Sequence, residues 1–169
     1  MKTIIIYESK TGFTRRYAGW AAESLGCECI PLKDASREKL AGYDRAIFGG
    51  WIMANMISGL SKIREMGVSP SVVFAVGASP AFEEVLTQMR EQNQLGETPF
   101  FYFEGGVDYG RLGFVQRMML RMMKKMTEKK KDMTRQEAAI VQLLAGNFDH
   151  TDREQMKGML AYLGEKDNG

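Results

Sequence analysis

Cysteine and histidine are scarce in this sequence, which limits the chemistry that its side chains can supply. Cys27 and Cys29 are the only cysteines, and His150 is the only histidine. The cysteines lack the Cys-x-x-Cys spacing of redox and zinc sites, and on a strand their side chains would share one face. We therefore interpret them as small core hydrophobes. His150 stands just before a helix start signal and is interpreted as solvated, so we expect no metal site and identify no catalytic acid or base.

Long apolar runs are also missing. The longest uncharged stretches, residues 46–61 and 66–82, contain Gly, Ser, Asn or Pro. They fall short of the roughly 18 continuous apolar residues that a membrane-spanning helix needs. Met1 and Lys2 lead directly into a short apolar run, without a signal-peptide cleavage site. We therefore expect a cytoplasmic protein.

A strong net charge is absent as well, but the charge is unevenly distributed. The chain carries +2 overall, which gives no indication of nucleic-acid binding. Residues 111–135 contain nine Lys or Arg against two acids, Glu128 and Asp132, and so carry a local charge of +7. Because the whole chain carries +2, the remainder carries −5. The sequence therefore predicts a basic module on an acidic body.

Apolar strands and helices alternate along most of the chain. Strands are expected at residues 4–7, 27–32, 44–50, 72–77 and 100–104. Helices are expected at residues 13–25, 36–42, 57–66, 80–94 and 151–163. The strands are apolar without alternation, which indicates burial on both faces of a parallel sheet. The pattern predicts one α/β domain over residues 1–169, a doubly wound five-stranded parallel sheet with helices on both faces.

Particular residues mark the expected ends of these helices. Gly26 and Gly164 are predicted to stop the first and last helices, because glycine adopts the left-handed conformation of a helix C-terminus. Pro80 can open a helix at its first turn. Thr151-x-x-Glu154 is a capping box, which predicts that the last helix begins near Thr151.

The loop after the first strand is rich in hydroxyl groups. It offers Ser9, Thr11 and Thr14, followed directly by the start of a helix whose dipole favours an anion. The Gly-Lys-Ser/Thr end of a P-loop and the Gly-x-Gly-x-x-Gly dinucleotide pattern are both absent. The loop is therefore a candidate phosphate site, and an ordinary turn with Ser9 or Thr11 as helix cap is the alternative.

The run Ser9-x-Thr11-Gly12-x-Thr14 resembles the FMN phosphate loop of the flavodoxin family. This resemblance implies FMN as cofactor, the strand order 2-1-3-4-5, and a site at the carboxyl ends of the strands. Loops after the third and fourth strands, residues 49–55 and 77–82, would border the flavin ring. The cofactor-binding residues implied are Ser9, Lys10, Thr11, Gly12, Phe13, Thr14, Gly50, Trp51, Ile52, Met53, Gly77, Ala78 and Ser79. Trp51 either stacks on the flavin or plugs the end of the core.

An extra segment of about 107–148 separates the fifth strand from the last helix. It contains an amphipathic helix with a basic face and an apolar stripe of Val115, Met118, Met119, Met122, Met123 and Met126. Six such side chains are worth roughly 1.5–3 kcal/mol each when buried, so the stripe is expected to cover something. The alternatives are the protein's own core, an anionic membrane surface contacted through Arg117–Met126, and an adaptable binding groove.

This basic insert resembles that of the menaquinone-dependent protoporphyrinogen oxidases and related flavodoxin-domain proteins. The matching features include Gly105-Gly106-x-x-Tyr109-x-Arg111, Asp132-x-Thr134-Arg135 and Thr151-Asp152-x-Glu154. The resemblance implies an FMN-dependent oxidoreductase that passes electrons to a quinone or another small acceptor, at the inner face of the membrane. A porphyrinogen substrate does not follow, because the insert is rich in methionine and poor in aromatics. The alternatives are an electron carrier without a substrate of its own and a flavin-free module that binds a membrane or a partner.

Overall fold

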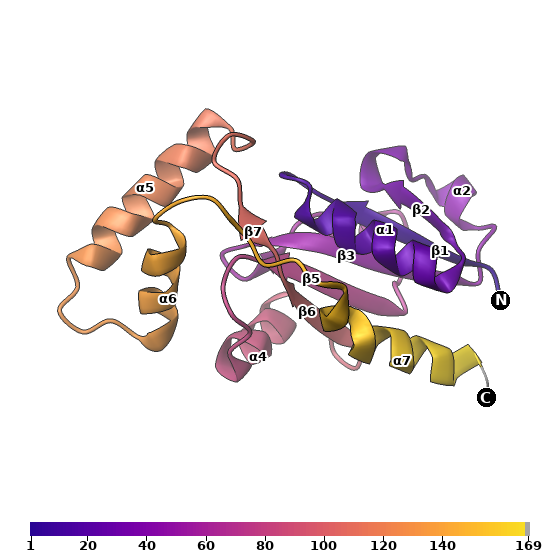
Figure 1. Ribbon diagram of the computed structural model, residues 1–169. Coiled ribbons are helices and arrows are strands. Elements are labelled where there is room, and N and C mark those ends of the chain that lie inside the picture. Colours follow the sequence, from indigo (N-terminus) through magenta and orange to yellow (C-terminus); the bar gives the residue numbers. More distant parts are fainter. Residues whose placement is uncertain (168–169) are drawn as a thin grey trace.

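Five parallel strands form the centre of the molecule, as the computed structural model of residues 1–167 shows (Figure 1). Their order is β2-β1-β3-β5-β6, which confirms the predicted order 2-1-3-4-5. The bounds are β1 Thr3–Glu8, β2 Glu28–Pro31, β3 Arg45–Met53, β5 Val72–Gly77 and β6 Phe100–Glu104. The central strands are buried on both faces, because helices cover both sides of the sheet.

One face of the sheet is covered by α1 (Phe13–Leu25), the short 3-10 helix η2 (Arg153–Met156) and α7 (Lys157–Asp167). Aromatic rings fill this layer: Tyr17 stacks on Phe103 with ring centroids 4.9 Å apart. The other face is covered by the 3-10 helix η1 (Leu32–Asp34), α2 (Arg37–Leu40) and α3 (Leu60–Glu65). A further helix, α4 (Glu83–Gln92), follows β5.

The helix ends predicted from the sequence are confirmed for the first helix and wrong for later ones. The bounds of α1 are those predicted, and Gly26 closes the helix in the left-handed conformation at φ 61°. The last helix is different: the cap is Asp152, whose side chain accepts from the Glu154 N–H, and not Thr151. The prediction that Gly164 stops this helix is also wrong, since α7 continues to Asp167. Pro80 likewise lies before α4 rather than in its first turn.

The third strand is longer than predicted. It continues through Gly49 and Gly50 to Met53 and then turns back into β4 (Met56–Ile57), with Met53 paired to Met56. Ala54 and Asn55 form the turn with φ values of 48° and 64°. Two successive positive φ values are the geometry of a tight hairpin turn, and such turns usually contain glycine. The residues that we expected in a loop are therefore part of a hairpin, and the next helix begins at Leu60 rather than at Ile57.

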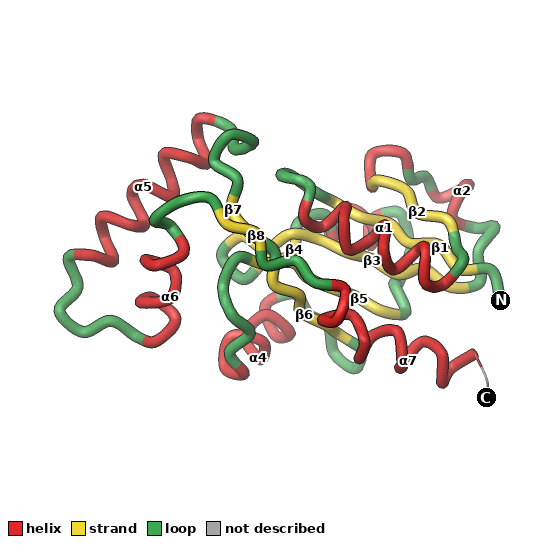
Figure 2. The backbone as a smooth tube through the Cα atoms, viewed as in Figure 1, coloured by secondary structure: helices red, strands yellow, loops and turns green. Residues whose placement is uncertain are grey.

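The segment between β6 and η2 forms an arm that projects from the sheet domain, which is the sheet with the helices that cover it (Figures 1 and 2). Its base is a pair of short antiparallel strands, β7 (Gly106–Val107) and β8 (Phe148–Asp149). Two helices, α5 (Phe114–Glu128) and α6 (Arg135–Leu143), lie side by side at its end. Among the described helices, none is long and apolar enough to cross a membrane.

Candidate functional site

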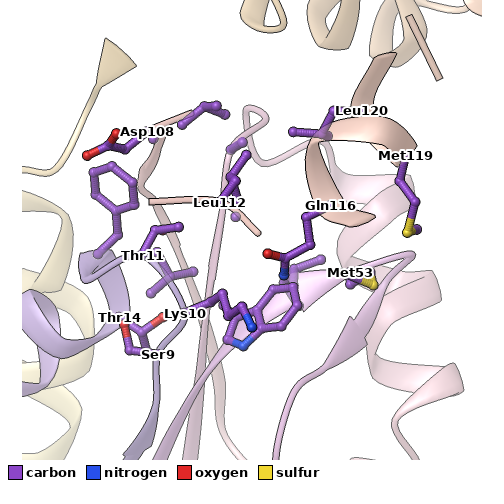
Figure 3. Close-up of a pocket in the computed structure, with 18 of the residues that line it drawn as sticks. Ser9, Lys10, Thr11, Thr14, Met53, Asp108, Leu112, Gln116, Met119 and Leu120 are labelled. Atoms are coloured by element: carbon purple, nitrogen blue, oxygen red, sulfur yellow. The ribbon is translucent and has the colours of Figure 1, made fainter. Parts of the chain in front are cut away.

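A cavity of about 230 Å³ lies at the carboxyl ends of the central strands (Figure 3). The loop after β1, the β3–β4 hairpin and the end of β5 form its floor and sides, and α5 of the arm forms the opposite wall. Its lining is polar near the hydroxyl-rich loop and mostly apolar elsewhere. The cavity therefore has one end suited to an anion and another suited to a flat apolar group.

The loop from Ser9 to Gly12 leads directly from β1 into α1. The Ser9 hydroxyl accepts a hydrogen bond from the Gly12 N–H at 3.1 Å. Gly12 is the N-cap of α1, with φ 101°, and no side chain caps the first N–H groups of the helix. Thr14, in the first turn, is buried and lines the cavity. The loop thus presents hydroxyls and helical N–H groups at one place, as an anion requires.

The first turn of α1 carries positive charge where a helix usually carries negative charge. It contains no acid, whereas Arg15 and Arg16 lie within it and Lys10 lines the cavity just before it. Basic residues oppose the helix dipole at this end. Arg16 is neutralised by Asp149, with Nη1 2.5 Å from Oδ2. The remaining positive potential favours an anionic ligand beside the loop.

The β3–β4 hairpin is held in place by one buried amide. Asn93 is 3 % exposed, and its Oδ1 accepts from the Ile57 N–H at 2.8 Å. Its Nδ2 donates to the carbonyls of Asn55 at 2.7 Å and Met89 at 2.8 Å. Since the hairpin carries Trp51 to Ala54 into the cavity wall, Asn93 fixes that wall from behind. Sequence reasoning missed Asn93, because nothing local marks an amide whose partners lie 36 and 38 residues away.

The double glycine of β3 is explained by packing. A Cβ on Gly49 would lie 2.0 Å from the Phe74 ring, and one on Gly50 would lie 2.4 Å from the Ser58 carbonyl oxygen. Gly50 does not line the cavity, whereas Trp51, Ile52 and Met53 do. Gly49 and Gly50 both stand where any larger side chain would clash. In the structure they make room for the protein's own side chain and backbone.

The end of β5 is anchored by Tyr102. The Tyr102 hydroxyl donates to the Ser79 carbonyl at 2.6 Å, and a Cβ on Gly77 would lie 2.3 Å from the same hydroxyl oxygen. Burial raises the pKa of Tyr102 to about 12, so the hydroxyl remains a donor well into the alkaline range. Gly77 and Ala78 line the cavity, but Ser79 does not.

Helix α5 supplies a wall that the sequence did not place at the site. Gln116, Met119, Leu120 and Met123 of the helix line the cavity, together with Leu112 just before it. Figure 3 shows Gln116, Met119 and Leu120 on the opposite side of the cavity from Ser9 and Thr14. The spacing of three and four residues was visible in the sequence, and it indicated one helical face. What that face covers could not be read from the spacing.

The apolar stripe of α5 is not part of the protein's core. No residue of the helix is buried, and the exposed fractions of the stripe run from 42 % for Met119 to 67 % for Met126. The core alternative for this stripe is therefore wrong. Met119 and Met123 form one edge and line the cavity, while Val115, Met118 and Met122 form the other edge and do not. One helix thus presents apolar side chains both to the cavity and to the solvent.

Ten of the thirteen residues that we expected at the site line this cavity. The three others, Gly12, Gly50 and Ser79, do not line it. Residues that were not expected there include Val76, Gly106, Val107 and Asp108, in addition to the α5 wall, while Ala54 belongs to the loop of residues 49–55 that was expected to border the ring. The structure therefore gathers the predicted loops at one place, and their contacts with a cofactor stay a prediction.

Histidine and cysteine lie away from the cavity. His150 is about half exposed, with Nδ1 3.5 Å from the Glu104 carboxylate. Cys27 and Cys29 pack against the aromatic core layer, and burial raises the pKa of the Cys29 thiol to about 11. Among the side chains that the structure describes, no group of three His, Cys, Asp or Glu is arranged to hold a metal ion.

Comparison with known proteins connects this geometry to a family. A family model described as a flavodoxin domain matches residues 4–134. Among curated protein sequences, none matches this chain significantly.

Solved structures with a similar arrangement include flavodoxin 2 from Bacillus cereus, which is 18 % identical with a TM-score of 0.46 over 62 % of this chain and 84 % of that one. A flavodoxin from the domain Archaea is 12 % identical, with a TM-score of 0.44 over 62 % and 85 % of the two chains. The Trp repressor binding protein from Bacillus subtilis is 18 % identical, with a TM-score of 0.44 over 89 % of this chain and all of that one.

Proposed function

Because the chain belongs to the flavodoxin family, whose domain model covers residues 4–134, we propose that it is an FMN-dependent oxidoreductase. Its flavin would pass electrons to a small apolar acceptor of the quinone class. FMN as cofactor and electron transfer as the general role follow from the family. The acceptor class and the existence of a substrate site are our proposal.

The residues present fit FMN. The uncapped start of α1, the Ser9 and Thr11 hydroxyls and the surrounding positive charge suit a phosphate group. Trp51, Ile52 and Met53 on one side, with Gly77 and Ala78 beside them, offer an apolar wall with backbone groups suited to a flavin ring. We propose these residues, with Lys10, Phe13 and Thr14, as the cofactor site, and Gly12, Gly50 and Ser79 as its supports.

FMN supplies the redox chemistry when bound, and the protein's part is to position it and to control access. The cavity-facing side chains of α5, Met119 and Met123 in particular, would cover the end of the site opposite the phosphate loop once FMN is bound. No described acid or base other than Lys10 and Asp108 lines the cavity, so proton exchange is left to solvent or to these two groups.

The apolar wall from α5 is the observation that carries the acceptor class. A protein that only docks to other proteins needs its flavin edge accessible, whereas here Met119, Leu120 and Met123 of α5 line the cavity. Apolar, polarizable methionines suit a flat and uncharged ring such as a quinone. This supports a small acceptor that enters between α5 and the β3–β4 hairpin.

The test is anaerobic reduction of the FMN-loaded protein, followed by rapid mixing with a short-chain menaquinone analogue. We expect reoxidation that saturates with quinone concentration. The variant M119Q/M123Q should raise the half-saturating concentration roughly tenfold, because about 1.4 kcal/mol of apolar contact is lost. The matched control M118Q/M122Q changes the same residue types on the outer edge and should leave the half-saturating quinone concentration unchanged.

Three results would contradict this assignment. Reoxidation that stays linear in quinone concentration would indicate collision without a site. Rapid electron transfer to a protein acceptor alone, without any small-molecule turnover, would favour the electron carrier instead. A colourless protein that binds no FMN after reconstitution would favour the flavin-free module.

The outer edge of α5 supports a second element of the proposal, peripheral contact with an anionic membrane from the cytoplasmic side. Val115, Met118, Met122 and Met126 are 48–67 % exposed, and Phe114 at the helix start is 73 % exposed. Arg117, Arg121, Lys124 and Lys125 lie on the same helix, and Lys129, Lys130 and Lys131 follow it. An apolar edge flanked by basic residues fits the boundary of an anionic bilayer. A membrane-borne quinone would then lie next to the cavity.

Sedimentation with vesicles tests this contact. We expect the protein to pellet with vesicles of phosphatidylcholine and phosphatidylglycerol, and not with phosphatidylcholine alone. The variant M118Q/M122Q should release it, while M119Q/M123Q serves as the matched control. Equal binding to both vesicle types would contradict an electrostatic component, and no pelleting at all would favour a protein partner.

We propose that residues 1–169 act as one domain, in which the insert of residues 107–148 carries both the cavity wall and the membrane-facing edge.

A further inference from the structure

Arg111, a residue of the insert, touches the phosphate loop. Its Nη1 donates to the Thr11 carbonyl oxygen at 3.1 Å, a contact between residues 100 positions apart in the chain. The same nitrogen lies 3.0 Å from the point where a Cβ on Gly12 would be. Gly12 has φ 101°, so both its conformation and its missing side chain admit the guanidinium beside the loop.

The guanidinium has hydrogen-bonding capacity left for a ligand. Arginine has five N–H donors, and one of them is used by the Thr11 carbonyl. Arg111 Nε also lies 3.3 Å from Asp108 Oδ2, in a pair whose side chains are 65 % and 34 % exposed. A pair exposed to this extent is worth little, so it does not hold the guanidinium against a stronger anion.

The other charges around the loop are arranged differently. Arg16 is engaged by the Asp149 carboxylate at 2.5 Å and by the Thr151 hydroxyl at 2.6 Å. Lys10 lines the main cavity, while Arg111 lines a neighbouring cavity that meets the first at Thr11, Phe13, Val107 and Asp108. Arg111 is thus the guanidinium that contacts the loop backbone, and its ion pair with Asp108 is exposed to solvent.

We propose that Arg111 is a ligand of the FMN phosphate. The sheet domain supplies hydroxyls and helical N–H groups, and the insert adds a guanidinium whose fork matches two phosphate oxygens. Arg111 donors that the Thr11 carbonyl does not use would hold the phosphate dianion. The inference rests on FMN as the cofactor. It makes Arg111 a link between cofactor loading and the position of the insert.

The experiment compares FMN with riboflavin, which has the same ring and no phosphate. Affinities of the apoprotein are measured by quenching of flavin fluorescence, in a buffer without phosphate. We expect Arg111→Gln to weaken FMN binding roughly tenfold, in the range of one charge-assisted hydrogen bond, and to leave riboflavin binding unchanged. The salt dependence of FMN affinity should also become shallower, because one fewer cation contacts the phosphate.

Two further variants sharpen the comparison. Arg117→Gln removes the same charge from exposed α5 and should leave both affinities unchanged, which separates local contact from net charge. Arg111→Lys keeps the charge without the fork and should recover part of the FMN affinity. Circular dichroism and the melting temperature confirm that each variant is folded.

The outcomes separate cleanly. Equal loss of FMN and riboflavin affinity in Arg111→Gln would show that Arg111 only braces the loop, and would overturn the proposal. Unchanged FMN affinity would overturn it as well. If the unaltered apoprotein binds neither flavin, the cofactor assignment itself fails, and the inference about Arg111 falls with it.

Discussion

The Phe74 ring occupies the space beside Gly49, where a Cβ would lie 2.0 Å from the ring atom Cζ. The two residues are directly paired across β3 and β5. Phe74 is fully buried and its ring lies 5.5 Å from that of Phe103. The glycine is therefore required by the core of the sheet, although it stands only two residues before the cavity-lining Trp51.

Gly49→Ala is expected to lower the free energy of unfolding by about 2 kcal/mol or more, because the buried ring must move to admit one methyl group. Urea unfolding followed by tryptophan fluorescence measures the change. Combining Gly49→Ala with Phe74→Leu should cost less than the sum of the two single changes, which a double-mutant cycle detects. Gly19→Ala is the control, since nothing lies within 4 Å of its Cβ position in α1. Additive single costs would contradict the packing explanation.

This pair also shows where sequence reasoning reached its limit. The apolar strands, the order of the sheet and the hydroxyl loop of Ser9 to Thr14 were predictable, because each is a pattern of neighbouring residues. The role of Gly49 was not, because its partner lies on another strand. The Ala54–Asn55 turn was missed for a related reason: it lacks the glycine that usually marks such a hairpin.

The cavity wall formed by α5 could not be predicted from the sequence, for another physical reason. Spacing alone predicts which side chains of a helix share a face, but not what the face meets. Here the stripe is divided, with Met119 and Met123 at the cavity and Met118 and Met122 in solvent. That division depends on how the β7–β8 base sets the arm, which no local pattern encodes.

Asn93→Asp is expected to loosen the β3–β4 hairpin. The substitution keeps the shape of the side chain but removes the Nδ2 donor to the Asn55 and Met89 carbonyls and buries a carboxylate. The free energy of unfolding should fall by at least about 2 kcal/mol. FMN affinity should fall with it, because Trp51 to Ala54 lose their support. Urea unfolding and flavin fluorescence titration measure the two effects.

Gln88→Ala provides the control for this prediction. The Gln88 side chain accepts from the Asn55 side chain at 3.3 Å and is exposed, so its removal should change stability by about 0.5 kcal/mol or less. If Asn93→Asp and Gln88→Ala proved equally mild, the buried amide would not be what holds the hairpin.

The two cysteines are expected to be unreactive in the folded protein. Burial raises the pKa of the Cys29 thiol to about 11 and also raises that of Cys27. At pH 8 the thiolate fraction of Cys29 is then on the order of 0.001, against about 0.2 for an unperturbed cysteine. Modification by a disulfide reagent should be slow in buffer and fast in 6 M urea. The variants Cys27→Ser and Cys29→Ser show which cysteine gives which kinetic phase of the labelling reaction. Fast labelling of the folded protein at pH 8 would contradict the prediction.

Tyr102→Phe tests the anchor of the β5 loop through the dependence of stability on pH. The Tyr102 pKa is about 12 in the folded protein, against 10 for the ordinary side chain. Between these values the folded state keeps the proton that the unfolded state has lost. The contribution of Tyr102 is therefore fully present below pH 10 and is lost as the pH rises to 12. A shift of this size corresponds to about 2–3 kcal/mol. Urea unfolding at pH 7, 10.5 and 11.5 should show a weaker alkaline decline in Tyr102→Phe.

At pH 7 the same variant should be less stable by about 1 kcal/mol, since the Ser79 carbonyl loses its donor. Tyr43→Phe is the comparison: the Tyr43 hydroxyl donates to the Glu28 carboxylate at the surface, where the pair contributes little. The hydrogen bond with Glu28 also raises the pKa of Tyr43, but this pair is exposed, so the Tyr43 variant should differ from the unaltered protein much less than Tyr102→Phe does at all three pH values. If Tyr102→Phe differed as little, the buried hydroxyl would not be what ties Ser79, and with it Gly77 and Ala78, to the sheet beneath the cavity.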